Sequence, residues 1–309
     1  MKTLNEITAG FIGAGAMGSA LIRAALRVMD GRRIFITSRT AETSTRLVSE
    51  LGVTRAENNA SLVDRCDIVF LAVKPAQLSP VLAEIAPRCG GKILVSMAAG
   101  VTLAALRSAL GGAEGGESAS ALIRVMPNIA AGIGEGMTAL AVESGESGAE
   151  AAALVSGILA PSGKVERVDE DLFDCVTAIS GCGPAYGFIF IEALADAAVS
   201  LGMPRKTAYT FAAQTLKGAA SLVLESGLHP AALKDSVCSP SGATIQAVRS
   251  LEAGGFRSSV IEAALTAAQK SRAIGLQKDR WHNPHTGSVA VRRCGNVPNL
   301  GGTAQPCAP

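Results

Sequence analysis

The sequence predicts an α/β domain built on a parallel sheet, followed by a domain made only of helices. Three observations lead to this prediction. Short apolar runs alternate with helical patterns through about residue 168, as in successive βαβ units. After Asp169 the strand patterns stop, and long helical patterns follow one another. A glycine-rich turn joins the first apolar run to the first helical pattern, which is typical of α/β domains that bind nucleotides.

The glycine-rich turn reads G-x-G-x-x-G at Gly13, Gly15 and Gly18, between an apolar run ending at Ile12 and a helical pattern over residues 19–29. The first glycine permits the tight turn, the second lets a ligand approach the backbone, and the third lets helix and strand pack closely. The helix N-terminus offers N–H groups and a partial positive charge to phosphates. The turn therefore predicts a dinucleotide-binding domain of the Rossmann type, with an ordinary glycine-rich turn as the alternative.

The end of the second predicted strand, residues 34–37, bears on the choice of cofactor. A carboxylate at this position would hold the ribose 2′-hydroxyl of NAD, but Ser38 and Arg39 stand there instead, before a predicted helix over residues 41–51. A hydroxyl and a guanidinium suit a 2′-phosphate, because arginine donates in pairs to phosphate oxygens. The sequence therefore favours NADPH, with NADH possible. The alternative is that Arg39 is a solvated loop residue.

Two further apolar runs, residues 66–73 and 92–96, predict strands buried on both faces of a parallel sheet. A helix is predicted over residues 76–87, strands over 123–128 and 137–142, a helix over 147–159 and a short strand over 165–168. Ligands bind at the carboxyl ends of parallel strands, so the glycine turn, Ser38, Arg39, Lys74 and residues 98–100 should converge on one crevice. Lys74 acts either as a catalytic lysine or through a backbone that lines the crevice.

The second half predicts helices over residues 171–179, 184–201, 206–225, 230–237, 245–252 and 257–274. A turn containing Gly181, Gly183 and Pro184 is predicted to separate the first two, with the proline in the first turn of the second. The helix over residues 184–201 is apolar nearly all round and must be buried on every side. A small helical domain covers it poorly, so we expect a second subunit to pack against it, most simply as a two-fold dimer.

A second informative stretch comprises Ser239, Pro240, Ser241, Gly242, Ala243 and Thr244. It presents a proline-stiffened turn, a glycine and hydroxyls at the start of a predicted helix. Free N–H groups there would bind a small carboxylate, and the hydroxyl of Thr244 could donate a hydrogen bond to an amine nitrogen. The alternative is a plain helix start capped by serine.

Composition excludes several classes of protein. The 309 residues are enough for two domains, and a net charge of +2 without a basic, aromatic-rich stripe argues against nucleic acid. Seven cysteines without C-x-x-C or metal-ligand spacing predict reduced thiols in a cytoplasmic protein and no metal site. We expect no signal peptide and no membrane segment, because no apolar run approaches the ~18–20 residues of a span. From residue 276 onward the composition predicts a disordered tail.

Six motifs in this order make the sequence resemble pyrroline-5-carboxylate reductase, the last enzyme of proline biosynthesis. They are residues 13–18, 72–75, 125–128, 180–186, 239–245 and 251–257, and the resemblance spans roughly residues 7–275. It implies an α/β Rossmann-type N-terminal domain (1–168) followed by an all-α dimerisation domain (169–275) that also binds substrate. It also implies a homodimer or higher homo-oligomer, with each substrate site between the cofactor crevice of one subunit and the helices of both.

The resemblance also implies site residues by position. Cofactor contacts are expected from Ile12, Gly13, Ala14, Gly15, Ala16, Met17, Ser38, Arg39, Asn59, Ala72, Val73, Lys74, Pro75, Ala98, Ala99 and Gly100. Substrate contacts are expected from Glu170, Ser236, Val237, Ser241, Gly242, Ala243 and Thr244. The family usually has glycine in place of Ser241 and serine in place of Cys182. The second change is nearly isosteric, but a side chain at position 241 is costly if the backbone there needs a positive φ.

The implied reaction transfers a hydride from the nicotinamide to the imine carbon of a five-membered ring. The two carbons must lie ~3–3.5 Å apart, and the carboxylate of the substrate is held by the N–H groups of residues 241–244. The hydroxyl of Thr244 is expected to bond the ring nitrogen and is the one catalytic side chain assigned. Solvent can supply the proton, which agrees with a chain whose three histidines have no catalytic setting.

Rival interpretations remain at this point. A β-hydroxyacid dehydrogenase shares the two-domain plan but usually carries a catalytic lysine on the long helix of the second domain, and residues 171–201 contain no lysine. Another imine reductase is a second possibility. A non-catalytic NADPH-binding regulator would explain the glycine turn but not the stretch over residues 239–244.

Overall fold

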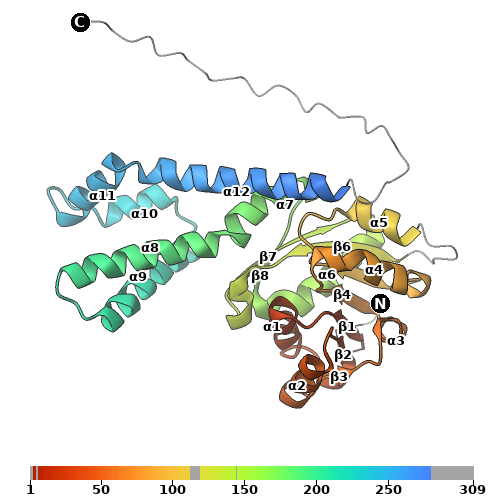
Figure 1. Ribbon diagram of the computed structural model, residues 1–309. Coiled ribbons are helices and arrows are strands. Elements are labelled where there is room, and N and C mark those ends of the chain that lie inside the picture. Colours follow the sequence, from red (N-terminus) through yellow and green to blue (C-terminus); the bar gives the residue numbers. More distant parts are fainter. Residues whose placement is uncertain (1–2, 5, 112–118, 144, 280–309) are drawn as a thin grey trace, which may run out of the picture.

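A computed structural model describes residues 3–4, 6–111, 119–143 and 145–279 of the chain (Figure 1). The first part is built on one sheet, whose described strands are β1 (Ala9–Ile12), β2 (Ile34–Thr37), β3 (Thr54–Arg55), β4 (Ile68–Leu71), β5 (Ile93–Ser96), β6 (Ala121–Met126), β7 (Gly136–Val142) and β8 (Gly163–Arg167). Their order is β3-β2-β1-β4-β5-β6-β7-β8. Strands β1 to β6 are parallel, and β7 turns antiparallel to β6. The predicted doubly wound sheet is confirmed, and its reversal point lies at β1.

Helices cover both faces of the sheet. One layer contains α1 (Ala16–Ala25), α2 (Ala41–Leu51) and α6 (Glu146–Leu159); the other contains α3 (Asn59–Arg65), α4 (Pro75–Ile85) and α5 (Leu103–Gly111). Successive strand residues alternate between the layers, because side chains of a strand point to opposite faces. Phe11 stacks on Phe70 of the neighbouring strand at 4.5 Å between ring centroids in the first layer, and Ile12 and Leu71 lie in the second.

Short helical turns complete this part, at Gly31–Arg33, Ala86–Arg88, Ile129–Ile133, Ala160–Ser162 and Glu170–Leu172. The strand at residues 34–37 and the helix at residues 41–51 are confirmed to the residue. Three elements, β3, α3 and α5, were not predicted. Strand β3 has only two residues, but α3 carried a signal: the side chain of Asn58 accepts from the amide of Ser61, and the hydroxyl of Ser61 accepts from the amide of Asn58.

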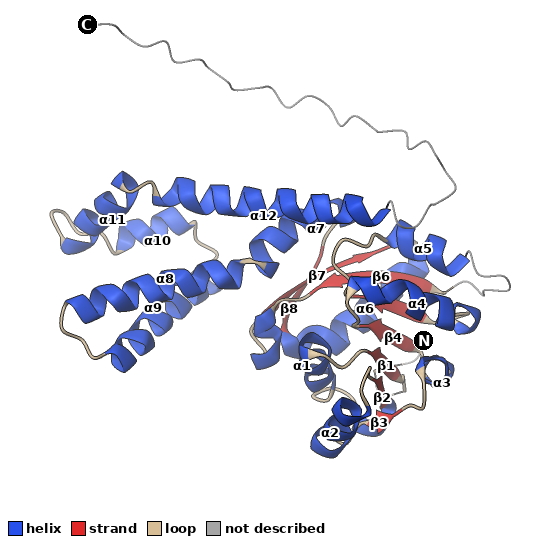
Figure 2. Ribbon diagram, viewed as in Figure 1, coloured by secondary structure: helices blue, strands red, loops and turns tan. Residues whose placement is uncertain are grey.

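The second part is entirely helical in its described residues and projects to one side of the sheet (Figures 1 and 2). It comprises α7 (Phe173–Val176), a π-helical turn (Thr177–Gly181), α8 (Gly183–Ser200), α9 (Arg205–Ser226), α10 (Pro230–Ser236), α11 (Ala243–Ala253) and α12 (Phe256–Asp279). Helix α12 returns along the domain to pack against α7 and the π-helical turn. It continues beyond the predicted end near residue 274, so the disorder predicted from residue 276 onward is wrong for residues 276–279, which are helical. The rest of the predicted tail, residues 280–309, lies outside the described residues.

Pro184 lies in the first turn of α8, as predicted, but a π-helical turn (Thr177–Gly181) takes the place of the expected interruption between α7 and α8. Residues Glu170–Ser200 form one helical run of 31 residues, which by length and composition could cross a membrane. The expectation that no segment reaches that length was therefore wrong. The reason is that the π-helical turn continues the helical backbone from α7 to Gly181, with a single residue between that turn and the start of α8 at Gly183.

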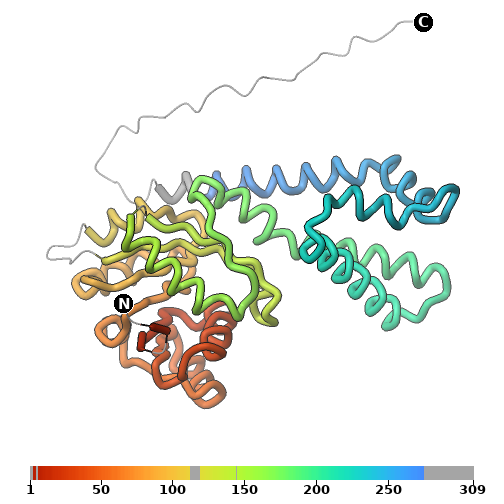
Figure 3. The backbone as a smooth tube through the Cα atoms, turned by 180° about the vertical axis from the view of Figure 1, so that it is seen from behind, coloured from red at the N-terminus to blue at the C-terminus, as the bar shows by residue number. Residues whose placement is uncertain are grey.

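The core of the helical domain is small. Where α8 and α9 pack together, the buried residues of the shared cluster are Ala195, Ala208 and Ala212. Large apolar side chains on the same domain are exposed, among them Phe188, Ile189, Phe211, Leu222, Leu224, Ile261 and Leu265. Figure 3, the view from behind, shows these helices extending away from the sheet, with no other described segment lying over them. An apolar surface of this extent is typical of a face that another protein chain covers.

Candidate active site

The three glycines of the glycine-rich turn have three different structural roles. Gly13 has a φ of +97°, and a Cβ there would lie 2.9 Å from the backbone of Ala72. A Cβ on Gly18 would lie 2.3 Å from the carbonyl oxygen of Gly13. Around Gly15, by contrast, the space is open, and this residue precedes α1 without a side-chain hydrogen bond that caps the helix. The fold itself requires Gly13 and Gly18, whereas Gly15 leaves room for an anion at the helix N-terminus.

Two adjoining cavities, of about 240 and 300 Å³, form a crevice at the carboxyl ends of β1, β2 and β4. Gly13, Ser38, Arg39, Val73 and Gln77 line both. The first cavity lies against the glycine turn and Lys74, and the second reaches Thr37, Asn59 and Pro80. The crevice therefore extends from the N-terminus of α1 to the β2 side of the sheet, as an elongated dinucleotide requires.

Most of the residues predicted to contact cofactor line this crevice: Ile12, Gly13, Ala14, Gly15, Ser38, Arg39, Asn59, Ala72, Val73 and Lys74. The others do not line it but lie near the same edge of the sheet: Ala16 and Met17 in the first turn of α1, Pro75 at the start of α4, and Ala98, Ala99 and Gly100 after β5. Sequence reasoning missed Thr37, Thr40, Thr43, Gln77, Pro80 and Val81. Thr37 could have been found, because it is the last residue of a predicted strand.

The β2 end of the crevice combines a cation with a chain of oriented hydrogen bonds. The hydroxyl of Thr37 donates to Oδ1 of Asn59 at 2.7 Å, and Nδ2 of Asn59 donates to Glu84 at 2.7 Å. A carboxylate can only accept here, so Glu84 fixes the orientation of the Asn59 amide. Arg39 is exposed and lines both cavities. Its guanidinium is available to a phosphate bound at this end.

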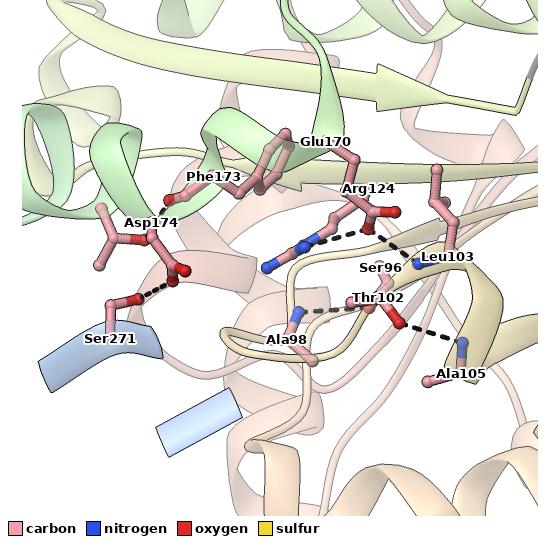
Figure 4. A network of polar contacts seen from close by, with 11 residues as sticks. Ser96, Ala98, Thr102, Leu103, Ala105, Arg124, Glu170, Phe173, Asp174 and Ser271 are labelled. Carbon is pink, nitrogen blue, oxygen red and sulfur yellow. Dashed lines mark hydrogen bonds and ion pairs between the residues drawn. The ribbon is translucent and has the colours of Figure 1, made fainter. Parts of the chain in front are cut away.

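Glu170 lies at the junction of the two domains (Figure 4). Its Oε1 accepts from the guanidinium of Arg124 at 3.0 Å and from the amide of Leu103 at 2.8 Å. The guanidinium also lies 4.3 Å from the ring centroid of Phe173. Glu170 thus links β6, the start of α5 and the first helix of the helical domain. A direct contact of this carboxylate with substrate stays a prediction.

The turn before α11 has a positive φ at position 241, the conformation that is costly for a residue with a side chain. Ser241 has a φ of +59° and, among the described residues other than glycine, is the one with a positive φ. The amide of Gly242 donates to the carbonyl of Ser239 at 3.0 Å, and a Cβ on Gly242 would lie 2.3 Å from the Ser239 hydroxyl. Gly242 precedes α11 and gives it no side-chain cap, so the alternative of a serine-capped start is not what the structure has. The first N–H groups of α11 are left for an anion.

One chain does not bring this turn to the crevice. The turn and the neighbouring Ser236 and Val237 lie at the end of the helical domain that points away from the sheet, in both views of the chain (Figures 1 and 3). The side chain of Thr244 is exposed there. Ser236, Val237 and residues 241–244 therefore gather in one place, the cofactor residues gather in another, and Glu170 lies at the junction between the domains.

A Rossmann-type sheet, an open phosphate site at the first helix and an attached helical domain define a class of nicotinamide-nucleotide oxidoreductases. Residues 170–274 match the family model described as pyrroline-5-carboxylate reductase dimerisation, and residues 8–100 match the one described as NADP oxidoreductase, coenzyme F420-dependent. The chain belongs to the pyrroline-5-carboxylate reductase family.

The similarity extends over nearly the whole length of the relatives. The pyrroline-5-carboxylate reductase of Escherichia coli is 42% identical, with 86% of this chain and 97% of that protein covered. The reductase of Methanosarcina acetivorans is 40% identical at the same coverage. The crystal structure of Plasmodium falciparum pyrroline carboxylate reductase with NADP bound superposes with a TM-score of 0.75 at 32% identity, covering 88% of this chain and all of that one.

Proposed function

We propose that this chain reduces 1-pyrroline-5-carboxylate to L-proline with a hydride from NADPH, the last step of proline biosynthesis. The observation that carries the proposal is the presence in one chain of the dinucleotide crevice and the left-handed turn before α11, within a sequence 42% identical to a named reductase over 97% of that protein. The reaction is an oxidoreduction at a carbon–nitrogen double bond.

The residues of the crevice fit the cofactor. The open space at Gly15 and the uncapped start of α1 suit the pyrophosphate, while Ser38 and Arg39 suit a 2′-phosphate. No carboxylate ends β2, so NADPH is the preferred form, with NADH accepted more weakly. The bound nicotinamide supplies the hydride. With the adenosine end on the β2 side of the crevice, the nicotinamide would lie toward the ends of β5 and β6.

The substrate is held by its acid group and its ring nitrogen. The N–H groups at the start of α11 bind the carboxylate, and the left-handed Ser241 orients the turn for this contact. The Thr244 hydroxyl bonds the ring nitrogen and so selects the ring face that meets the nicotinamide. The imine takes its proton from solvent, and no covalent nucleophile is needed.

The active site is completed by a second copy of the chain. The turn before α11 lies far from the crevice of its own chain, so the turn that meets each crevice comes from the other subunit of a homodimer. The exposed apolar side chains of α8, α9 and α12 form the contact. The apolar helical run Glu170–Ser200 would then lie at the dimer interface, because it forms the first part of the region that matches the dimerisation model. The described cysteines are free thiols, which agrees with a cytoplasmic location.

A spectrophotometric assay tests the proposal. The purified chain is mixed with NADPH and 1-pyrroline-5-carboxylate, NADPH consumption is followed, and proline is identified by mass spectrometry. We expect both NADPH loss and proline, and no turnover of a β-hydroxyacid with NADP⁺. Binding of NADPH without oxidation would instead favour the regulator, and turnover of the hydroxyacid alone would favour the dehydrogenase.

A further inference from the structure

Two motifs that the mechanism leaves without a role contact each other at the domain junction. Strand β6 ends at Met126, and Asn128 follows it after Pro127. Ser180 lies in the π-helical turn that leads into α8. Nδ2 of Asn128 donates to the carbonyl oxygen of Ser180 at 3.2 Å and lies 3.4 Å from its hydroxyl. Oδ1 of Asn128 accepts from the amide of Met137 at 3.3 Å, and the Ser180 hydroxyl donates to the Met137 carbonyl at 3.4 Å. These bonds close a ring that ties the turn to the sheet.

The sequence explains why the Ser180 carbonyl needs an outside donor. In an α-helix the carbonyl of residue i accepts from the amide of residue i+4, which for Ser180 is Pro184. Proline has no N–H, so this carbonyl has no α-helical partner. The next amide, that of Ala185, donates to the carbonyl of Cys182 instead. The Asn128 side chain therefore supplies the hydrogen bond that Pro184 removes, and does so from another domain.

The turn is also held by close packing. A Cβ on Gly181 would lie 3.1 Å from the Cε of Met126, so the glycine lets the turn pack against the end of β6 without displacing the methionine side chain. Helix α12 also packs against this turn. The helical domain is thus fixed to the sheet at the end of β6, where α8 begins.

This attachment lies at the end of the crevice where the nicotinamide is expected. Strand β6 runs parallel to β5, so Asn128 and Ala98 lie at the same edge of the sheet. The adenosine side of the crevice is at β2, three strands away from β5 in the sheet order. A change in the direction of α8 at this turn would shift the sheet and its crevice relative to the helical domain and to the partner subunit packed on that domain. It would therefore also shift the crevice relative to the turn before α11 that the partner supplies.

We propose that Asn128 is a positioning residue for hydride transfer: through the Ser180 carbonyl it sets the angle between the sheet and α8, and thereby the distance between the nicotinamide and the substrate. This inference rests on the proposed function. It assigns Asn128 no contact with either reactant. Pro184 contributes to the same arrangement. Because it has no N–H, the Ser180 carbonyl lacks an α-helical partner and depends on Asn128 for its hydrogen bond.

A double-mutant cycle tests the proposal with Asn128→Ala, Pro184→Ala and the double variant. We expect Asn128→Ala to lower kcat about tenfold, because small misplacement of reacting atoms is costly. The Kd for NADPH should change less than twofold, and the primary isotope effect on kcat with NADPH deuterated at the transferred position should rise. In the Pro184→Ala background the new amide can pair with Ser180, so loss of Asn128 should cost much less.

The possible outcomes distinguish the positioning role of Asn128 from the proposed reaction. Equal loss of kcat from Asn128→Ala in both backgrounds, or an unchanged isotope effect, would overturn the positioning role while leaving the proposed reaction intact. Absence of imine reduction by the unmodified chain would overturn both. Should Asn128→Ala fail to fold, Asn128→Asp serves instead, because its carboxylate still accepts from Met137 but cannot donate to Ser180.

Discussion

Oε1 of Glu170 lies 3.0 Å from Nη1 of Arg124 and also accepts a hydrogen bond from the amide of Leu103. One carboxylate oxygen therefore joins β6, α5 and the helical turn Glu170–Leu172. The Arg124 side chain is only 9% exposed, and that of Glu170 is 26% exposed. A guanidinium that is this well buried needs an anion beside it. The pair therefore holds the first helical turn of the second domain against the sheet.

Removing this carboxylate should lower stability. We expect Glu170→Ala to reduce the free energy of unfolding by about 2 kcal/mol, because it leaves the buried Arg124 without its partner. Urea unfolding of the purified protein measures the change. Glu135→Ala is the control, since its ion pair with Lys217 is 61% exposed on both sides and should contribute no more than about 0.5 kcal/mol. Equal losses for the two variants would contradict the structural role of Glu170; a raised KM with unchanged stability would point instead to direct substrate contact.

Arg39 should discriminate between the two nicotinamide cofactors. Arg39→Ala removes the exposed guanidinium that lines both cavities. One charge-assisted contact contributes on the order of 1.5–3 kcal/mol, so the Kd for NADPH should rise roughly 10- to 100-fold while that for NADH hardly changes. Fluorescence titration with each cofactor measures this. An equal loss for both would show that Arg39 does not contact a 2′-phosphate.

The glycines of the first turn should separate folding from binding. Gly18→Ala places a Cβ against the carbonyl of Gly13, whereas Gly15→Ala places one in open space. We expect Gly18→Ala to lower the melting temperature markedly, and Gly15→Ala to fold normally but lose NADPH affinity, since a Cβ there meets the pyrophosphate. Differential scanning fluorimetry with and without NADPH distinguishes them. Normal NADPH binding by Gly15→Ala would contradict the placement of the cofactor.

Ser241 stores backbone strain that glycine would relieve. A non-glycine residue in the left-handed region costs roughly 1–2 kcal/mol, so Ser241→Gly should stabilise the protein by up to about 1 kcal/mol after the greater entropy of unfolded glycine is subtracted. Ser241→Ala keeps the strain and should give no gain. Chemical denaturation of the two variants in parallel is the measurement. A loss of stability in Ser241→Gly would mean that the serine hydroxyl, and not the backbone, decides this position.

Features that depend on contacts within a few residues could be predicted from the sequence, whereas features that depend on residues distant in sequence could not. Local signals predicted β2, α2 and the glycine turn, since each depends on contacts within a few residues. The position of Pro184 in the first turn of a helix was predicted, but the π-helical turn before it was not, because the Ser180 carbonyl in that turn accepts from Asn128, which is distant in sequence. The link between Arg124 and Glu170 depends on the assembled sheet in the same way. The substrate turn was found from its residues, but its distance from the crevice is a property of the whole helical domain.

The central claim is that the crevice of one subunit meets the substrate turn of its partner, and a heterodimer tests it most directly. Gly15→Ala inactivates the crevice, and Thr244→Ala removes the hydroxyl that bonds the ring nitrogen. We expect Thr244→Ala to lower kcat/KM for the imine while NADPH binding stays close to normal, with Thr244→Ser retaining most activity.

The two variants are co-expressed with different affinity tags, and the heterodimer is purified and assayed for imine-dependent NADPH oxidation. If each site draws on both subunits, one of the two sites is intact, and the heterodimer should show about half of the wild-type activity. If each site lay within one chain, both sites would be damaged, and activity no higher than the mean of the two variant homodimers would contradict the claim.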